Sequence, residues 1–248
     1  MDKRFSGKVA VVTGGASGFG EGIARRFAQE GAHVAIADLN EGAAKNLAKE
    51  IGGLAVRADI SREGDVKDLV QTVRAQWGEI NILVNNAGIG HKPQALETLS
   101  EETFDRILAI NVKSVFLMAR EIVPAMKKRK RGAILNIAST GGISPRPNLT
   151  WYNASKGWMI TATRAMAVEL APFGIRVNAI NPVAGETPLL ATFMGEDTPE
   201  IRAKFLASIP IGRFSTPADI AAAACFLCSD EASMITGVAL EVDGGRCI

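Results

Sequence analysis

The feature that most constrains this fold is a regular alternation of short apolar runs with longer amphipathic stretches. The first run, residues 8–13 (KVAVVT), is rich in β-branched side chains, which is typical of a buried parallel strand. A glycine-rich turn and a helical pattern closed by Gly31 come next, and a second apolar run, residues 33–37, ends at Asp38. This order predicts a strand–helix–strand unit with parallel strands.

The same alternation continues to the end of the chain. One long helix is expected after Ser100, which with Thr103 can cap its start, and Pro124 is expected to kink or end that helix. Residues 182–213 are predicted to be irregular. Further strands are predicted at 54–58, 80–84, 133–138, 175–180 and 238–242, and further helices at 41–50, 63–77, 151–173 and 218–228.

This pattern predicts an α/β fold, a Rossmann-type doubly wound parallel sheet of about seven strands with helices on both faces. No repeat, linker or low-complexity segment divides the sequence, so residues 1–248 are interpreted as a single domain.

Composition narrows the classes of partner. The net charge of +2 gives no general attraction to nucleic acid or anionic membrane, and no apolar run reaches the length of a membrane span. The basic run 127–131 has two interpretations, a nucleic-acid or nuclear-targeting signal and a solvated helix C-terminus whose cations complement the helix dipole. The second is favoured, so neither nucleic acid nor membrane is expected as a partner.

The cysteines and histidines predict no metal site. Cys225, Cys228 and Cys247 are an odd, low number, which favours reduced thiols in the cytoplasm. Cys225 and Cys228 form a lone CxxC without a second ligand pair, and a buried helix face explains them better than zinc. His33 and His91 are too far apart in sequence to suggest a cluster.

The glycine-rich turn, residues 13–20 (TGGASGFG), suits a phosphate. Bare glycines let the backbone approach a ligand, and the following helix start supplies N–H groups. The Walker pattern is excluded because Glu21 and Gly22 stand where Lys and Ser or Thr are needed, and the strict GxGxxG fingerprint is absent. By itself, this turn could be purely structural.

Asp38 makes a dinucleotide more specific. It lies 18 residues beyond Gly20 at a predicted strand end, where a carboxylate can accept both hydroxyls of an adenosine ribose. The same charge would repel a 2′-phosphate, and neither Ser17 nor Leu39 supplies a compensating cation. The sequence therefore predicts NAD(H) rather than NADP(H). The alternative interpretation of Asp38 is an ordinary polar residue after a strand, without a role in cofactor binding.

A second group of residues suggests acid–base chemistry. Ser139 ends the predicted strand 133–138, Tyr152 is the only tyrosine in the chain, and Lys156 follows one helical turn later. A hydroxyl, a phenol and an ammonium could therefore converge at the edge of the sheet. Singly, each has an ordinary structural explanation.

Together these motifs resemble the classical short-chain dehydrogenase/reductase family over essentially the whole chain. Their spacing fits as well, with 28 residues from Asn111 to Ser139, 13 more to Tyr152 and 4 more to Lys156. The matching segments are TGGASGFG at 13–20, Asp59, NNAG at 85–88, Asn111, Ser139, YNASK at 152–156, and NP at 181–182 with Thr187.

The resemblance implies four catalytic residues. Tyr152 would be the general acid in reduction and the base in oxidation, and Lys156 would lower its pKa and hold the nicotinamide ribose. Ser139 would bind the substrate oxygen, and Asn111 would anchor a water that links Lys156 to solvent. The implied NAD contacts are Gly14, Ser17, Gly18, Phe19, Gly20, Asp38, Leu39, Asp59, Ile60, Asn86, Ala87, Gly88, Tyr152, Lys156, Pro182 and Thr187.

Two positions depart from the family pattern. Val183 stands where glycine usually follows the proline, which could change the backbone under the nicotinamide, and Phe19 replaces the usual isoleucine. The substrate should be covered by residues 183–213, with a largely apolar wall. Candidate contacts are Leu189, Leu190, Phe193, Met194, Phe205 and Leu206, then Ile143, Asn148, Trp151 and His91 at the mouth, with Arg146 and Arg202 as possible charged exceptions.

The expected function is NAD(H)-dependent interconversion of a small or medium secondary alcohol and its ketone. A 3-oxoacyl-(acyl carrier protein) reductase is the first alternative, although Asp38 disfavours the NADPH that such enzymes usually prefer. A non-catalytic dinucleotide-sensing protein is the second, and the intact catalytic residues argue against it. Ala154, Ala162, Ala165 and Ala167 on helix 151–173 favour close helix packing, and the family resemblance implies a homotetramer or homodimer.

Overall fold

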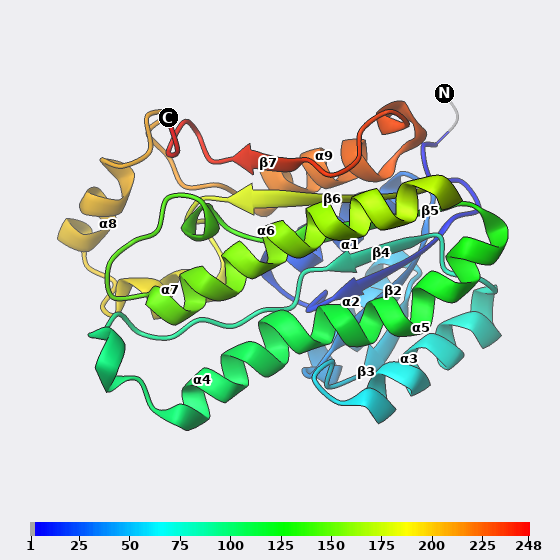
Figure 1. The fold of residues 1–248 in the computed structure, drawn as a ribbon, viewed down its shortest axis with the longest axis horizontal. Helices are drawn as coiled ribbons and strands as arrows, with labels where there is room; N and C mark the ends of the chain where they lie inside the picture. Colours follow the sequence, from blue (N-terminus) through cyan, green and yellow to red (C-terminus); the bar gives the residue numbers. More distant parts are fainter. Residues whose placement is uncertain (1–2) are drawn as a thin grey trace.

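The computed structural model describes residues 3–248, and its centre is one parallel sheet (Figure 1). The strand order is β3-β2-β1-β4-β5-β6-β7, and every neighbouring pair is parallel. This confirms the predicted doubly wound α/β fold. The strands are β1 (Val9–Thr13), β2 (His33–Asp38), β3 (Leu54–Arg57), β4 (Ile82–Asn85), β5 (Gly132–Ile137), β6 (Ile175–Pro182) and β7 (Ala239–Val242).

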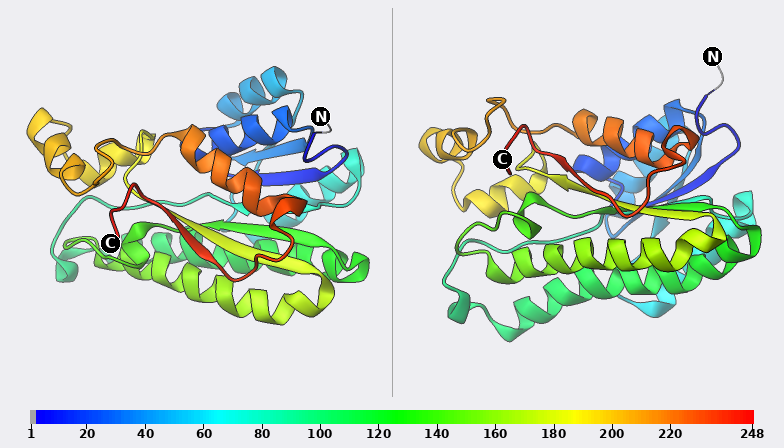
Figure 2. Two further views of the ribbon diagram at one scale, coloured as in Figure 1. Left: turned by 90° about the horizontal axis from the view of Figure 1, so that it is seen from above. Right: turned by 45° about the horizontal axis from the view of Figure 1, so that its top comes forward.

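Helices cover both faces of the sheet, so the molecule has three layers (Figure 2). Helices α1, α2 and α9 lie on one face, and α3, α5 and α6 lie on the other. The helices are α1 (Gly18–Gln29), α2 (Glu41–Ile51), α3 (Glu63–Trp77), α4 (Glu101–Leu108), α5 (Ser114–Arg129), α6 (Thr150–Leu170), α7 (Pro188–Met194), α8 (Pro199–Leu206) and α9 (Pro217–Cys228).

Each face of the sheet has its own apolar core. Alternate side chains of β1, such as Val12 on one face and Val11 on the other, enter the two cores because successive strand residues point to opposite sides. Cys225 and Cys228 are buried free thiols in the first core, as the helix-face interpretation predicts.

The prediction for residues 182–213 is wrong, because this segment contains α7 and α8. Two of its prolines start helices: Pro188 and Pro199 occupy the first helical turn, where a missing N–H costs nothing. Thr198 caps α8 through its side chain. Both helices lie beyond the carboxyl ends of the strands, over the edge where the sequence places its candidate site (Figure 1).

The helix after Ser100 also differs from expectation. Ser100 caps α4 as predicted, but a π-helical turn at Ala109–Lys113 separates α4 from α5. Pro124 does not end α5, which continues to Arg129. The carbonyl four residues before Pro124 belongs to the exposed Arg120, where water can replace the lost hydrogen bond.

The basic run ends α5 and is largely paired. Lys127, Arg129 and Arg131 form ion pairs with Glu169, Glu79 and Asp230, respectively. This supports a helix C-terminus whose cations are satisfied within the protein. Over residues 3–248, none of the helices combines the length and apolar character needed to traverse a lipid bilayer.

Candidate active site

A cavity of about 520 Å³ opens at the carboxyl ends of the strands. The strand order reverses between β1 and β4, and in open α/β sheets ligands bind at such a switch point. The glycine turn, the ends of β2 to β6, and helices α7 and α8 line this cavity. All the predicted cofactor residues line it except Gly20.

The glycine turn is shaped by close backbone approaches. Gly14 and Gly18 have φ of +58° and +52°, a left-handed conformation that side chains disfavour. A Cβ on Gly14 would lie 2.8 Å from Cα of Ala87. Gly20 does not line the cavity, and a Cβ at this position would collide with the Gly14 carbonyl, so the close packing of the turn requires glycine here.

The end of β4 holds this turn in place. Thr13 Oγ1 accepts hydrogen bonds from the backbone N–H groups of Asn86 and Ala87, at 3.0 and 3.1 Å. In return, Asn86 Nδ2 donates to the carbonyls of Thr13 and Gly14, both at 2.9 Å. Asn86 therefore shapes the phosphate-sized turn through the backbone.

Asp38 is fixed at the rim of the cavity. Its Oδ2 accepts from the N–H of Ala16 at 3.0 Å, and its Oδ1 accepts from the N–H of Asn40 at 2.9 Å. The carboxylate is therefore tied to the glycine turn on one side and to the start of α2 on the other. Ser17 and Leu39 line the cavity beside it, and neither side chain carries a charge.

Ser139, Tyr152 and Lys156 meet at the other end of the cavity. Lys156 Nζ lies 5.9 Å from the centroid of the Tyr152 ring and donates to the carbonyl of Ile137 at 2.8 Å. Ser139 Oγ accepts from the N–H of Gly141 at 3.0 Å and also hydrogen-bonds the Tyr152 phenol. The strand end and the first turns of α6 thus bring the three groups together as the sequence predicts.

Burial controls the protonation of this pair. It raises the pKa of Tyr152 to about 12, against the opposing effect of the hydrogen bond with Ser139. Burial also lowers the pKa of Lys156 to about 8. The direction of the Tyr152 pKa shift is therefore opposite to the lowering that the family resemblance implies.

Asn111 lies behind the cavity wall rather than in it. It is fully buried in the π-helical turn, where its Nδ2 donates to the carbonyl of Ile89 and to Ser155 Oγ at 2.9 and 3.0 Å. A Cβ on Gly88 would lie 3.3 Å from both Asn111 Oδ1 and Lys156 Nζ. The bare backbone of Gly88 is thus all that separates Asn111 from the lysine.

The comparisons with known proteins agree with this geometry. The family model described as Enoyl-(Acyl carrier protein) reductase matches residues 14–246. The chain belongs to the short-chain dehydrogenase/reductase family. It is 48% identical to the 4-formylbenzenesulfonate dehydrogenase of Comamonas testosteroni, over 97% of this chain and 98% of that protein.

Two further members of the family are similar over nearly their whole length. The 3-oxoacyl-[acyl-carrier-protein] reductase of Thermotoga maritima is 40% identical over 99% of this chain and 100% of that protein. The crystal structure of 3-ketoacyl-(acyl-carrier-protein) reductase from Brucella melitensis complexed with NADH is 56% identical, with a TM-score of 0.93, covering 98% of this chain and 99% of that one.

The two departures from the short-chain dehydrogenase/reductase pattern are accommodated by packing. Val183 is buried in an apolar cluster with Leu190 and Phe214. Among residues 3–248 only Lys130 and Asn148 are non-glycine residues with positive φ, so the backbone at Val183 does not need glycine. The Phe19 ring fills the space that Gly185 leaves open.

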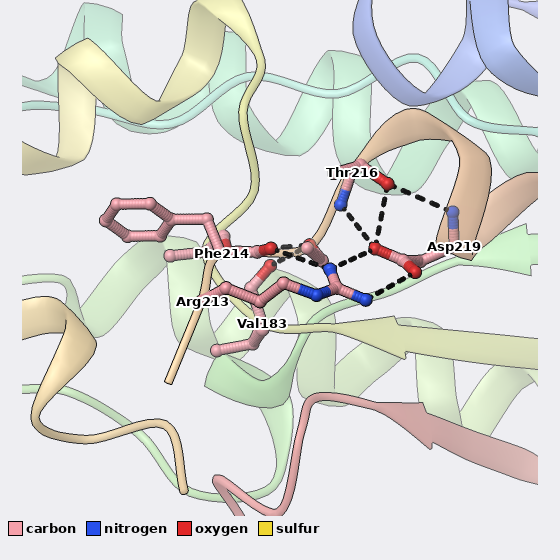
Figure 3. A network of polar contacts seen from close by, with 7 residues as sticks. Val183, Arg213, Phe214, Thr216 and Asp219 are labelled. Carbon is pink, nitrogen blue, oxygen red and sulfur yellow. Dashed lines mark hydrogen bonds and ion pairs between the residues drawn. The ribbon is translucent and has the colours of Figure 1, made fainter. Parts of the chain in front are cut away.

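A polar network fixes the backbone under this part of the cavity (Figure 3). Ser215 Oγ donates to the carbonyls of Val183 and Ala184, at 3.3 and 3.4 Å. The next residues begin α9 with a capping box, in which the Asp219 side chain accepts from the N–H of Thr216 at 2.8 Å and the Thr216 side chain accepts from the N–H of Asp219. Arg213 then binds both carboxylate oxygens of Asp219.

The predicted substrate wall is partly right. Leu189, Leu190, Phe193 and Phe205 line the cavity, and the Phe193 ring lies 4.8 Å from that of Tyr152. The other candidate contacts do not line the cavity. Met194 and Leu206 pack in an apolar cluster, and the remaining four are Ile143, Asn148, Trp151 and His91.

Of the two predicted charged exceptions, Arg146 lines the cavity, whereas Arg202 pairs with Asp197 outside it. Sequence reasoning missed Arg106 and Ile110, which also line the cavity. The available signal was their closeness to Asn111, which Arg106 and Ile110 precede by five residues and one residue. A helix that places Asn111 near the site also places neighbouring side chains there.

Proposed function

We propose that this protein is an NAD(H)-dependent oxidoreductase that interconverts a small or medium secondary alcohol and its ketone. The observation that carries the proposal is one cavity with the Asp38 carboxylate at one end and Ser139, Tyr152 and Lys156 at the other. The cavity extends from the glycine turn to the Tyr152 phenol, and this shape suits an extended dinucleotide with a substrate beside it.

The residues present fit that cofactor. The glycine turn leaves room for phosphate at the N-terminus of α1, and Asp38 can accept ribose hydroxyls. Lys156 and Thr187 would hold the nicotinamide end. When bound, the cofactor supplies or accepts the hydride.

The chain's own residues manage the proton. In reduction, the neutral Tyr152 phenol donates its proton to the carbonyl oxygen while Ser139 hydrogen-bonds that oxygen; in oxidation, the phenolate takes the alcohol proton. Lys156 stabilises the phenolate by its charge. All these groups are intact, which argues against a non-catalytic dinucleotide sensor.

The cofactor preference can be tested by equilibrium titration with NADH and NADPH. We expect NADH to bind more tightly, because Asp38 would repel a 2′-phosphate. Asp38→Asn should weaken NADH binding by about tenfold, the effect of losing charge on a hydrogen-bond acceptor, and should narrow the gap to NADPH.

Glu41→Gln is the matched control, since it removes an exposed carboxylate three residues away that does not line the cavity. It should leave both affinities unchanged. Tighter binding of NADPH by the wild-type protein would contradict the proposed preference.

A 3-oxoacyl-(acyl carrier protein) reductase activity remains the second candidate, supported by the relatives from Thermotoga and Brucella. The presence of NADH in the Brucella complex weakens the argument that such a reductase must prefer NADPH. Reduction of acetoacetyl-CoA compared with that of a simple ketone at saturating NADH distinguishes the two candidates. A strong preference for the thioester would favour the second.

A further inference from the structure

Arg146 places an unusual positive charge in the wall of the cavity. Its guanidinium donates to Ser208 Oγ at 3.0 Å and lies 4.3 Å from the centroid of the Phe205 ring. Arg202 and Arg213, from the same part of the fold, pair with Asp197 and Asp219. Within residues 3–248, no carboxylate forms an ion pair with Arg146.

The surroundings of Arg146 favour an added anion. Burial, and to a lesser degree the nearby Arg246 guanidinium, lower the pKa of Arg146. Arg246 is itself bound only to neutral groups of Ser144, and its Nε is buried without a partner in the described chain. Two half-buried cations that face neutral oxygens leave a positive potential that a ligand carboxylate or sulfonate would neutralise.

The position of this cation is fixed relative to the catalytic tyrosine. Asn153, the residue after Tyr152, is buried and donates from Nδ2 to the backbone carbonyl of Arg146 at 2.8 Å. The Phe205 ring supports the guanidinium, while Phe193 packs beside Tyr152. Within the same cavity, one aromatic ring therefore packs against the Arg146 guanidinium and another packs against the Tyr152 phenol.

We propose that Arg146 binds a carboxylate or sulfonate at the end of the substrate remote from the reacting carbon. The substrate is then an alcohol or carbonyl compound with an apolar body and a terminal anion. This inference rests on the proposed function, since Ser139 and Tyr152 define the reacting end. Arg106 also lines the cavity, but it is exposed, so water already solvates its charge.

The test is calorimetric titration of the protein saturated with NAD⁺, using three ketone probes of one shape. NAD⁺ is used because the NADH complex would reduce a ketone during the titration. These are 4-acetylbenzoate, 4-acetylbenzenesulfonate and the neutral 4-acetylbenzamide. We expect at least one anion to bind about tenfold or more tightly than the amide, as a desolvated charge-assisted pair should. Whichever anion binds more tightly identifies the head group.

Three variants locate the effect. Arg146→Gln should bring the anions to within about twofold of the amide, because it removes the charge on one partner of the pair. Arg146→Lys should keep part of the preference, since it retains charge without the bidentate fork. Arg202→Gln, a matched loss of charge on α8 outside the cavity, should leave the preference unchanged.

Several outcomes would overturn the inference. Wild-type protein that binds the amide as well as the anions, or binds none of the probes, refutes it without any variant. An anion preference that survives Arg146→Gln, or that disappears only in Arg106→Gln, assigns the charge elsewhere. Binding of NAD⁺ is measured first: its absence counts against the proposed function, whereas normal NAD⁺ binding without anion preference refutes this inference alone.

Discussion

Lys156 and Tyr152 are both pushed toward their neutral forms by the same cause, the exclusion of water. Each is more than nine-tenths buried, and each responds in its own direction: the lysine pKa falls to about 8 and the tyrosine pKa rises to about 12. At neutral pH the free protein therefore holds a protonated phenol beside an ammonium. This arrangement is ready to donate a proton to a carbonyl oxygen.

The titration of Tyr152 is directly measurable because it is the only tyrosine in the chain. We expect the phenolate absorbance near 295 nm to appear with a midpoint above the ordinary value, toward about 12. Ser139→Ala should raise that midpoint further, because the Ser139 hydrogen bond favours the phenolate. Tyr152→Phe, which should show no transition, is the control.

Circular dichroism at each pH establishes that the protein is still folded during this titration. A midpoint at or below about 10, the value of a free phenol, in folded protein would contradict the dominance of burial. The raised pKa of Tyr152 also predicts how activity depends on pH. Oxidation needs the phenolate and should accelerate as pH rises toward this pKa, whereas reduction should not.

The strands of the central sheet and the long helices that connect them were predictable, because strand and helix periods are local properties of the sequence. The elements around the substrate were not, since α7 and α8 are short and begin at prolines that resemble breaks. The closeness of Tyr152 and Lys156 was predictable for the same local reason, because the two residues lie one helical turn apart on α6.

The sequence named Arg146 and Arg202 as possible charged residues of the wall, but only the structure shows which of them lines the cavity and what surrounds it. Arg146 meets Ser208, 62 residues away, and Arg246 meets Ser144, 102 residues away. Contacts of this range depend on tertiary packing, which no spacing in the sequence encodes. Similarly, only the structure shows that the close approach of Gly20 to the Gly14 carbonyl leaves no room for a side chain.

The capping box of α9 should contribute to the stability of the fold. Arg213 and Thr216 hold the Asp219 carboxylate, and their contacts lower its pKa, with the Arg213 bond the largest cause. Asp219→Asn should destabilise the fold by about 1–2 kcal/mol, the size of a lost helix cap. Thermal unfolding at pH 7 measures this change.

The stabilisation by the Asp219 carboxylate should depend on pH. A lowered folded-state pKa means that the carboxylate stabilises the fold above its unfolded pKa of about 3.9, and that this stabilisation is lost as pH falls below it. The difference between wild type and Asp219→Asn should therefore shrink in acid. Asp197→Asn, at an exposed ion pair on α8, is the control and should leave the unfolding midpoint unchanged. Equal effects of the two variants would contradict the structural importance of the box.

At the scale of the molecule, one face of α6 is exposed and carries small or apolar side chains along its centre, with the charged Arg164 and Glu169 at its edges. Its exposed residues recur at helical spacing, Ala154, Trp158, Thr161, Ala165 and Val168, and Val168 is 80% exposed. Of the alanines expected on a packing face, Ala167 is instead buried against the sheet.

We expect this face of α6 to pack against a second copy of the chain, so that light scattering gives two or four times the 26.2 kDa chain mass. Ala165→Arg places a large charged side chain in the middle of the face at little cost in helix propensity, and should reduce the assembly to half its mass or less. Gln71→Arg, at an exposed site on α3, adds the same charge elsewhere and should leave the mass unchanged. A monomeric wild-type protein would contradict the expectation outright, and an Ala165→Arg assembly of undiminished mass would mean that another surface holds the copies together.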